Sequence, residues 1–365
     1  MSRDTSPALG TAELTLDAIS TDATPAELVR GFVPTPRFAH VSFDSYCPDP
    51  RQPTQAAAVA RLRAFVAELA TEADEGGGLF ARFRRRKPAA SLRGLYLDGG
   101  FGVGKTHLLA AAYHAAPPPK AYLSFAELSY TITSLGMATC LQALRGQRLL
   151  CIDEFELDDV ANTRLAATFL RGLRDHGGGT RVITTSNTLP TDLGLGRFAA
   201  EHFRREIGEI AAAFDTVHIE GEDYRHRPRW EGTPPGQVLT SRALRDAYER
   251  YRPPEGAKLF ADFPTLAARL AELHPIRYVR LLAPLDAVFL DGLAPIPDQN
   301  TALRFVHLVD KLYDEEVRLA VSATCDLPDL FLPEYRDKGY AKKYLRCLSR
   351  LHELLEESAV ARAGR

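Results

Sequence analysis

The sequence predicts an α/β fold in which a parallel sheet is flanked by helices. Short apolar runs recur along the chain and alternate with segments whose apolar residues have helical spacing. Uninterrupted apolar runs of this length are typical of strands that are buried on both faces of a sheet. A glycine-rich loop follows the first run of the predicted sheet, at the point where it would join a strand to a helix.

The elements follow one another in the order expected for such a fold. Apolar residues between Gln55 and Leu69 recur at helical spacing and predict an N-terminal helix. A triple glycine at 76–78 and the basic run 82–87 separate this helix from the predicted sheet. The predicted strands are 95–97, 121–125, 148–153, 180–185 and 216–219, and helices are predicted at 106–114 and 161–173.

A C-terminal part begins after the Arg-, Pro- and Gly-rich loop at 225–237. The apolar segments that end at Asp291 and Ser322 repeat, in order, those that end at Asp153 and Ser186. Either a strand–helix–strand unit has been duplicated and has diverged, or common strand–helix–strand patterning has produced the likeness. The predicted elements here are helices at 241–251, 263–272 and 302–313 and strands at 287–290 and 317–322.

These patterns divide the chain into four predicted parts. They are a flexible leader (1–36), an N-terminal helical segment (37–90), a core (91–235) and a C-terminal α/β extension (236–365). The leader is assigned from its Thr, Ala, Pro and Asp content, which is typical of loosely ordered segments.

The composition is that of an ordinary globular protein. Of the 365 residues, 45% are hydrophobic and 25% are charged, and the formal net charge is −2. This balance provides no overall attraction for nucleic acid or membranes, so nucleic-acid binding is not expected without a local patch. The five cysteines include no C-x-x-C pair, which argues against a zinc site and fits reduced thiols. With no signal peptide and no apolar segment of about 18 residues, we expect a cytoplasmic protein whose membrane contact is at most peripheral.

Residues 99–106 match the phosphate-loop pattern G-x-x-x-x-G-K-[ST]. Glycines let backbone N–H groups curl around phosphates, Lys105 would reach the β- and γ-phosphates, and the Thr106 hydroxyl would ligate magnesium. The helix that begins here adds its positive end. We therefore expect ATP and Mg²⁺ as ligands. The predicted nucleotide-binding residues are Gly99, Gly100, Phe101, Gly102, Val103, Gly104, Lys105, Thr106 and His107.

Two carboxylates end the third predicted strand, 48 residues after Lys105. In phosphate-loop NTPases an acidic residue at this place holds magnesium, so Asp153 and Thr106 are the predicted metal ligands. Glu154 beside it suits a general base that polarises the attacking water. An Asp-Glu pair after apolar residues is otherwise more often a surface turn.

Polar residues after the fourth strand complete the predicted catalytic set. Asn187 would lie between the γ-phosphate and the acidic pair, where it could orient water; a turn-capping role is the alternative. Arg205, or after it Arg197, is predicted to be an arginine finger that acts on a neighbouring subunit. The alternative for each is a solvated side chain, as most surface arginines are. We also expect Arg304 to sense the nucleotide, so that Arg304→Ala weakens ATP more than ADP; a salt bridge to a carboxylate is the alternative.

Residues 92–220 resemble an AAA+ ATPase core, with Walker A, Walker B and sensor 1 motifs. A fuller likeness, over about residues 35–356, is to the ZapE family of bacterial cell-division ATPases and its mitochondrial AFG-like relatives. The Walker motifs are shared by many ATPases, whereas the other elements are more specific. The segments that carry the likeness are 55–59, 94–106, 150–155, 185–193, 223–225, 302–305, 308–314, 321–323 and 349–351.

The resemblance implies a cytoplasmic, oligomeric ATPase, hexameric when active, that is associated with the division ring and its tubulin-like polymer. The mitochondrial relatives imply protein quality control instead. Residues 196–207 depart from the family's Leu-Gln-Arg and Phe-Leu-Pro-Ala-Ile stretch, so the arginine finger does not transfer by motif. Glu156 stands where Gln is common in the family.

A nucleic-acid ATPase of the helicase-loader type is the alternative class of function. Residues 104–109 also resemble those proteins, and the basic run 82–87 could bind phosphate backbones. Such a run is more often a solvated linker. The more specific C-terminal likeness favours action on a protein partner.

Overall fold

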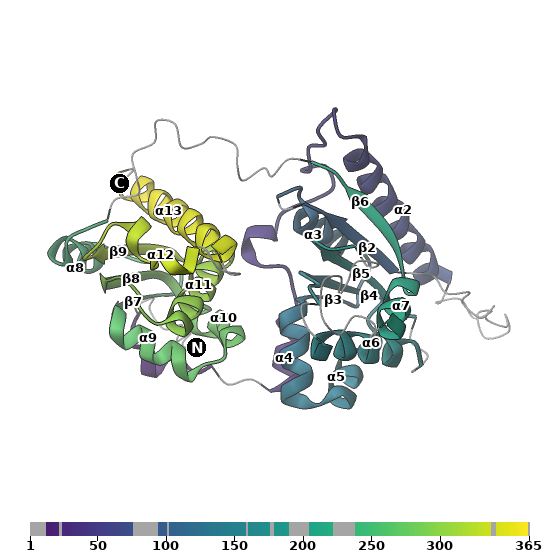
Figure 1. Cartoon of the computed structure of the whole chain (residues 1–365), viewed down its shortest axis with the longest axis horizontal. Helices are drawn as coiled ribbons and strands as arrows, with labels where there is room; N and C mark the ends of the chain where they lie inside the picture. The colour runs from purple at the N-terminus through teal and green to yellow at the C-terminus, as the bar shows by residue number, and fades with distance from the viewer. Residues whose placement is uncertain are drawn as a thin grey trace, which may run out of the picture. The chain divides into compact units, whose positions relative to one another are not determined.

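The computed structural model describes residues 12–21, 24–75, 94–100, 102–157, 160–175, 179–189, 204–221, 238–336 and 341–363. The chain forms two compact units, each with its own parallel sheet (Figure 1). One unit comprises Ala23–Pro228, and the other combines Met1–Asp22 with Arg229–Arg365. Among the described helices, none combines the length and the apolar character that a membrane span requires.

The first unit contains a five-stranded parallel sheet in the order β3-β4-β5-β2-β6 (Figure 1). Every residue of β2, β4 and β5 is buried. Apolar residues predominate in β2 and β4, as expected for strands covered on both faces, and buried polar residues such as Asp98, Asp153 and Ser186 lie toward the carboxyl ends. The predicted parallel sheet flanked by helices is confirmed. The strands are β2 (Gly94–Gly99), β3 (Lys120–Ser124), β4 (Leu149–Asp153), β5 (Arg181–Ser186) and β6 (Phe214–Ile219).

Helices cover both faces of this sheet. Side chains of α2 and α3 share one apolar cluster with one face, while those of α4, α5, α6 and α7 share another cluster with the opposite face. Local signals set the helix starts; in α4, for example, Ser124 and Glu127 form a reciprocal capping box. The helices are α1 (Pro25–Arg30), α2 (Pro53–Glu75), α3 (Lys105–Ala115), α4 (Phe125–Leu135), α5 (Met137–Leu144), α6 (Val160–Asp175) and α7 (Arg204–Ala212).

The strand order creates a switch point beside β2. The chain passes from β2 to the far side of the sheet at β3, returns through β4 and β5, and ends at β6 on the other side of β2. In open parallel sheets, ligands bind at the carboxyl ends of strands next to such a point. The carboxyl ends of β2, β4 and β5 therefore mark the place where a site is expected.

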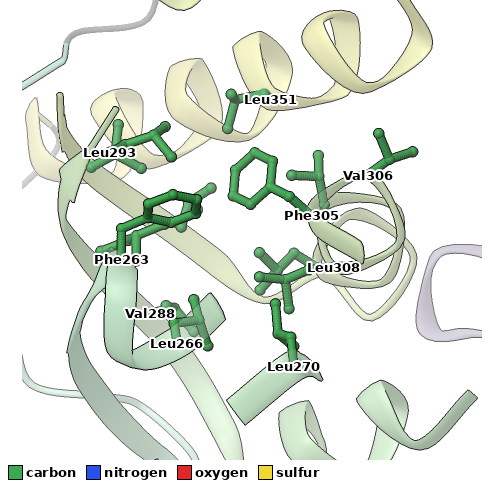
Figure 2. Close-up of a cluster of buried hydrophobic side chains, with 14 of the residues drawn as sticks. Phe263, Leu266, Leu270, Val288, Leu293, Phe305, Val306, Leu308 and Leu351 are labelled. Carbon is green, nitrogen blue, oxygen red and sulfur yellow. The ribbon is translucent and has the colours of Figure 1, made fainter. Parts of the chain in front are cut away.

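The second unit contains a four-stranded parallel sheet in the order β1-β7-β8-β9. Its apolar core lies between the sheet and helices α9, α11 and α13 (Figure 2). The strands are β1 (Ala12–Leu14), β7 (Ala257–Asp262), β8 (Leu285–Leu293) and β9 (Arg318–Ala323). The helices are α8 (Ser241–Arg250), α9 (Phe263–Glu272), α10 (Tyr278–Leu282), α11 (Gln299–Asp314), α12 (Pro333–Arg336) and α13 (Ala341–Ala363).

Side chains from distant parts of the chain meet in this second core. The rings of Phe263 and Phe305 lie edge to face with their centroids 5.7 Å apart, and Leu351 lies near Phe305 (Figure 2). The carboxylate of Asp310 on α11 accepts hydrogen bonds from Arg346 and Arg350 on α13, each at 2.7 Å. The two helices are thus held by apolar packing and by a shared ion pair.

The predicted flexible leader is wrong for residues 12–19. Residues 12–14 form the edge strand β1, which pairs with β7, and Leu16 and Ile19 are buried in the second core. Glu13 lies 3.5 Å from the buried ammonium of Lys258, which also donates to the carbonyl of Tyr248. Ala12, Leu14 and Leu16 alternate with polar residues, which is the period of a strand, but the run is short and lies in a segment whose composition is typical of loose order.

We expect Leu351→Ala to destabilise the second unit by about 2–5 kcal/mol, because it removes a fully buried side chain and leaves a cavity. Leu345→Ala on the same helix is the matched control, since Leu345 is 60% exposed and its truncation should change stability by less than about 0.5 kcal/mol. Urea unfolding followed by circular dichroism measures both variants. Equal effects of the two substitutions would contradict the packing of α13.

Candidate active site

The phosphate loop joins β2 to α3, as its sequence predicts. α3 begins at Lys105, directly after Gly104, whose φ of 89° lies in the left-handed region. A side chain at Gly104 would also collide with the ring of Tyr46, because its Cβ would lie 2.6 Å from a ring carbon. Glycine is therefore required here by the backbone angle and by the packing. Phe101, one of the predicted loop residues, lies outside the described residues.

A segment before the sheet braces the loop. The Tyr46 hydroxyl donates to the carbonyl of Val103 at 2.9 Å, and its ring lies edge-on to His107 with centroids 5.7 Å apart. His107 Nε2 lies 2.9 Å from the hydroxyl of Ser45, and burial lowers the pKa of this imidazole. Of the predicted loop residues, His107 thus contacts the bracing segment.

Lys105 is buried and its ammonium is held at the mouth of the loop. It donates to the carbonyls of Gly99 at 2.7 Å and Gly100 at 2.6 Å, and to Oδ1 of Asn187 at 3.0 Å. These three acceptors are uncharged carbonyl and amide oxygens. Phosphate oxygens would offer a stronger, charge-assisted partner.

Asp153 lies at the end of β4 and binds three neighbouring elements. Its Oδ1 accepts from the hydroxyls of Thr106, at 3.3 Å, and Thr185. Its Oδ2 accepts from the hydroxyl of Tyr122 at 2.9 Å. The loop helix, β3 and β5 are thus tied to one buried carboxylate.

Burial raises the pKa of Asp153 to about 6, and the nearby charge of Glu154 adds to this effect. The hydrogen bonds from Thr185, Tyr122 and Thr106 act in the opposite direction but do not cancel it. A buried carboxylate of this kind favours a bound cation, which would compensate the charge that burial disfavours. Carboxylate and hydroxyl oxygens are hard donors suited to magnesium, so Asp153 and Thr106 fit the predicted metal site.

Glu154 follows in a left-handed backbone conformation, with φ of 51°, which is uncommon for a residue with a side chain. Its N–H donates to the hydroxyl of Thr185 at 3.0 Å and to Oδ1 of Asp153 at 3.1 Å. These bonds help to hold a conformation that costs of order 1 kcal/mol or more. The side chain of Glu154 is exposed, so solvent water can reach its carboxylate.

Asn187 follows β5 and lies beside Lys105, as described above. Its backbone N–H and its side-chain Nδ2 both donate to Oε1 of Glu156, at 2.8 and 2.9 Å. Predicted residues from three separate motifs, Lys105, Asp153 and Asn187, are thus brought to the carboxyl edge of one sheet. Glu156 joins them although it was not predicted.

The three arginines with predicted roles differ in what the structure shows of their surroundings. Arg205 on α7 is 85% exposed and pairs with Glu209, which also contacts Arg171. Arg197 lies outside the described residues. Arg304 donates to the carbonyls of Leu270 and Leu273 at 2.6 and 2.8 Å. These hydrogen bonds hold the guanidinium of Arg304 against the end of α9, and its sensor role stays a prediction.

Comparison with known proteins identifies the family. The model of the AFG1-like ATPase family matches residues 34–242 and 250–363, which is most of the chain. The chain belongs to this family. It is a P-loop ATPase of the AAA+ type.

The cell division protein ZapE of Escherichia coli strain K12 is 26% identical over 361 residues, covering 84% of this chain and 92% of that protein. ZapE of strain O157:H7 matches equally. Among solved structures, the DnaC helicase loader has 18% identity and a TM-score of 0.37 over 50% of this chain and 99% of that one. The DnaI structure has 19% identity and the same TM-score, over 51% and 92%. Structural likeness at this level says nothing about function.

Several site residues of this AFG1-like ATPase escaped the sequence analysis. Tyr122, Thr185 and Glu156 contact the predicted residues across strands, and Tyr46 contacts the loop from far upstream. None belongs to a motif, such as the phosphate loop, whose residue types are dictated by the ligand they bind. The position of Thr185, two residues before Asn187, is the one signal that could have indicated it.

We expect Lys105→Ala to abolish ATP binding, because it removes the ammonium at the mouth of the loop. Lys120→Ala is the control: Lys120 donates to the carbonyls of His114 and Ala116 at the other end of α3, far along the helix from the loop. Calorimetry of folded variants with Mg-ATP measures the affinity. Unchanged affinity in Lys105→Ala would refute the assignment of the loop.

Proposed function

We propose that this ATPase converts ATP hydrolysis into mechanical work on a protein partner, the tubulin-like polymer of the division ring. The match to ZapE, a cell division protein, over 84% of this chain supports the proposal, because it includes the second unit as well as the ATPase core. Protein quality control, which the mitochondrial relatives suggest, is the other protein-directed function. In both, the protein acts in the cytoplasm or its organellar equivalent as a homo-oligomer, proposed to be a hexamer.

The observation that best supports ATP hydrolysis is that Lys105, Asp153 and Asn187 lie together at the carboxyl edge of the first sheet. The loop N–H groups and the ammonium of Lys105 bind the phosphates of ATP. Magnesium, when bound by Thr106 and Asp153, neutralises charge on the phosphate oxygens. The exposed carboxylate of Glu154 accepts a proton from the attacking water, and the amide of Asn187 helps to orient that water.

The proposed oligomer supplies a further charge in trans. Arg205 is the first candidate because its side chain is 85% exposed on α7 and could reach a neighbouring subunit. Arg197 is the second. Arg205 now pairs with Glu209, and a surface ion pair of this kind contributes little to stability and is easily exchanged.

We expect Glu154→Gln to bind ATP normally but to hydrolyse it about 10²-fold more slowly or worse, because the amide keeps the shape and cannot accept the proton. Asp175→Asn is a matched neutralisation of an exposed carboxylate, at the end of α6. Steady-state phosphate release and ATP calorimetry measure the two properties. Near-normal turnover in Glu154→Gln would exclude Glu154 as the base.

The trans arginine predicts that activity per subunit rises with protein concentration as oligomers form. Arg205→Ala should bind ATP yet stay inactive at every concentration, since such arginines contribute about 10³-fold or more. Mixing it with Lys105→Ala should restore some hydrolysis, because a head-to-tail interface combines different surfaces of the two variants. If Arg205→Ala and Arg197→Ala both hydrolyse ATP normally, the trans finger is refuted.

The partner can be tested by co-sedimentation with the purified tubulin-like division polymer. We expect Glu154→Gln to sediment with the polymer when ATP is present, because it holds the ATP-bound state, and Lys105→Ala not to do so. A parallel titration with single-stranded and duplex DNA at several salt concentrations tests the helicase-loader alternative. ATP-dependent DNA binding without polymer binding would replace the proposed function by that alternative.

A further inference from the structure

The geometry points to Glu156 as a positioning residue for ATP hydrolysis, which fixes the orientation of the Asn187 amide. The inference rests on the proposed role of Asn187. Oε1 of Glu156 accepts from the backbone N–H of Asn187 at 2.8 Å and from its Nδ2 at 2.9 Å. A single carboxylate oxygen therefore holds both the backbone and the side chain of this residue.

The amide orientation follows from this contact. With Nδ2 directed at the carboxylate, Oδ1 of Asn187 faces the ammonium of Lys105 at 3.0 Å. An asparagine amide has donors on one side and an acceptor on the other, so rotating it would place the donors against the ammonium. Glu156 and Lys105, with opposite charges, thus favour the same orientation. The face of Asn187 directed at the phosphate loop is an acceptor.

The backbone of Glu156 is itself anchored. Its neighbours Phe155 and Leu157 are buried, and the ring of Phe155 packs edge to face against Phe125 with centroids 5.0 Å apart. The N–H of Phe155 donates to the carbonyl of Thr185 at 2.7 Å, which ties the segment after β4 to β5. Glu156 therefore reaches Asn187 from a segment that is held by buried neighbours and by a backbone hydrogen bond to β5.

Both hydrogen bonds end on Oε1, so a single acceptor oxygen suffices to make them, with or without the charge of the carboxylate. A glutamine retains one carbonyl oxygen that can accept both bonds, which agrees with the Gln that is common at this position in the family. An alanine or methionine at 156 removes the acceptor, and methionine does so while nearly keeping the volume. These variants separate the loss of the hydrogen bonds from the loss of bulk.

We expect Glu156→Ala and Glu156→Met to lower kcat about tenfold, equivalent to about 1.4 kcal/mol in the barrier, while ATP affinity stays near normal. Glu156→Gln should retain most of the activity. In an Asn187→Ala background, Glu156→Ala should have no further effect, since nothing remains to be positioned. Steady-state kinetics with ATP calorimetry and thermal unfolding of each variant provide the measurements.

Three results would overturn the inference. They are normal turnover in both Glu156→Ala and Glu156→Met, equal impairment of Glu156→Gln, and independent, multiplicative effects of the Glu156 and Asn187 substitutions. Normal turnover in Asn187→Ala would instead refute the role proposed for Asn187, so the two failures are distinguishable. A parallel loss of ATP affinity and turnover would show that Glu156 only supports the structure.

A different set of observations concerns the second unit, whose strands β8 and β9 pair in the same register as β4 and β5. Leu149 lies opposite Arg181 in the first unit, and Ala287 lies opposite Arg318 in the second. The three pairs that follow keep this correspondence. The connecting helices α6 and α11 both contain 16 residues.

The same hydrogen bonds close both strand ends. Oδ1 of Asp291 accepts from the hydroxyl of Ser322, and the N–H of Gly292 donates to that hydroxyl at 2.8 Å. Gly292 has a φ of 73°, in the left-handed region like Glu154. The core residues in the corresponding positions are Asp153, Thr185 and Glu154. The sequence pattern had matched Ser322 to Ser186, which is wrong by one residue.

The packing around the two sheets agrees as well. α8 covers the face of β8 and β9 that corresponds to the face covered by α3 in the core. Asp262 accepts from the N–H of Thr265 at the start of α9, as Ser124 does from Glu127 at the start of α4. The sheet residues toward α8 are Ala287, Phe289 and Ala320, and their counterparts toward α3 are Leu149, Cys151 and Ile183.

We infer that the second unit is a diverged copy of the ATPase core that has lost the phosphate loop and takes no nucleotide. Leu239 forms a parallel bridge with Ser322, as Leu97 of β2 pairs with Thr185. After Leu97 the phosphate loop follows, whereas only Thr240 separates Leu239 from α8. The hydrogen bond between Asp291 and Ser322 is thus present although the short connection from Leu239 to α8 leaves no room for a phosphate loop. The shared register and hydrogen bonds favour duplication over common strand–helix–strand patterning.

Nucleotide stoichiometry of the full chain tests this inference. Calorimetry with Mg-ATP should give one site per chain in the native protein and in Asp291→Ala, and none in Lys105→Ala. Asp291→Asn, which keeps the size of the side chain, serves if the alanine variant is unstable. A site that survives in Lys105→Ala and disappears in the Lys105→Ala/Asp291→Ala double variant overturns it. If the double variant still binds one ATP per chain, the site does not depend on Asp291. That result would refute the role of Lys105 in binding ATP and would leave the inference about the second unit intact.

Discussion

The active edge of this ATPase depends on one buried carboxylate. Asp153 accepts hydroxyl hydrogen bonds from the loop helix, from β3 and from β5, so the elements that must meet at the nucleotide are tied to a single group. Burial disfavours its charge and raises its pKa to about 6. The protein therefore keeps a carboxylate in a place that a cation would stabilise, and its hydroxyl donors hold that carboxylate in position before any ligand arrives.

Contiguous motifs made part of this site predictable. The loop and the Asp153-Glu154 pair follow mechanical patterns, because curling around phosphates needs glycines and holding magnesium needs an acid at a strand end. The parallel sheet was predictable for a similar reason, since strands buried on both faces are rich in apolar residues. In both cases the requirement is local, so a few neighbouring residues carry the whole signal.

The remaining residues could not be predicted because their roles arise from strand pairing. Tyr122 and Thr185 are ordinary strand residues, and only the register of β3, β4 and β5 brings their hydroxyls to Asp153. Tyr46 reaches the loop from an irregular segment that has no periodicity. β1 was missed because the alternation of Ala12, Leu14 and Leu16 with polar residues is short, and its partner strand β7 lies far along the chain. Contacts of this kind are specified by the tertiary fold.

The two units share the hydrogen bonds at their strand ends but differ in the phosphate loop, so the hydrogen bonds can be considered apart from ATP hydrolysis. Both close the ends of two adjacent strands with an aspartate, a hydroxyl and a left-handed residue, although only one carries a phosphate loop. The arrangement of aspartate, hydroxyl and left-handed residue therefore recurs in a unit for which we infer no nucleotide site. In the ATPase unit the left-handed position bears Glu154 in place of glycine, at a cost in backbone energy that glycine avoids. A carboxylate at such a position, beside Asp153 and open to solvent, fits the role toward water that we propose for Glu154.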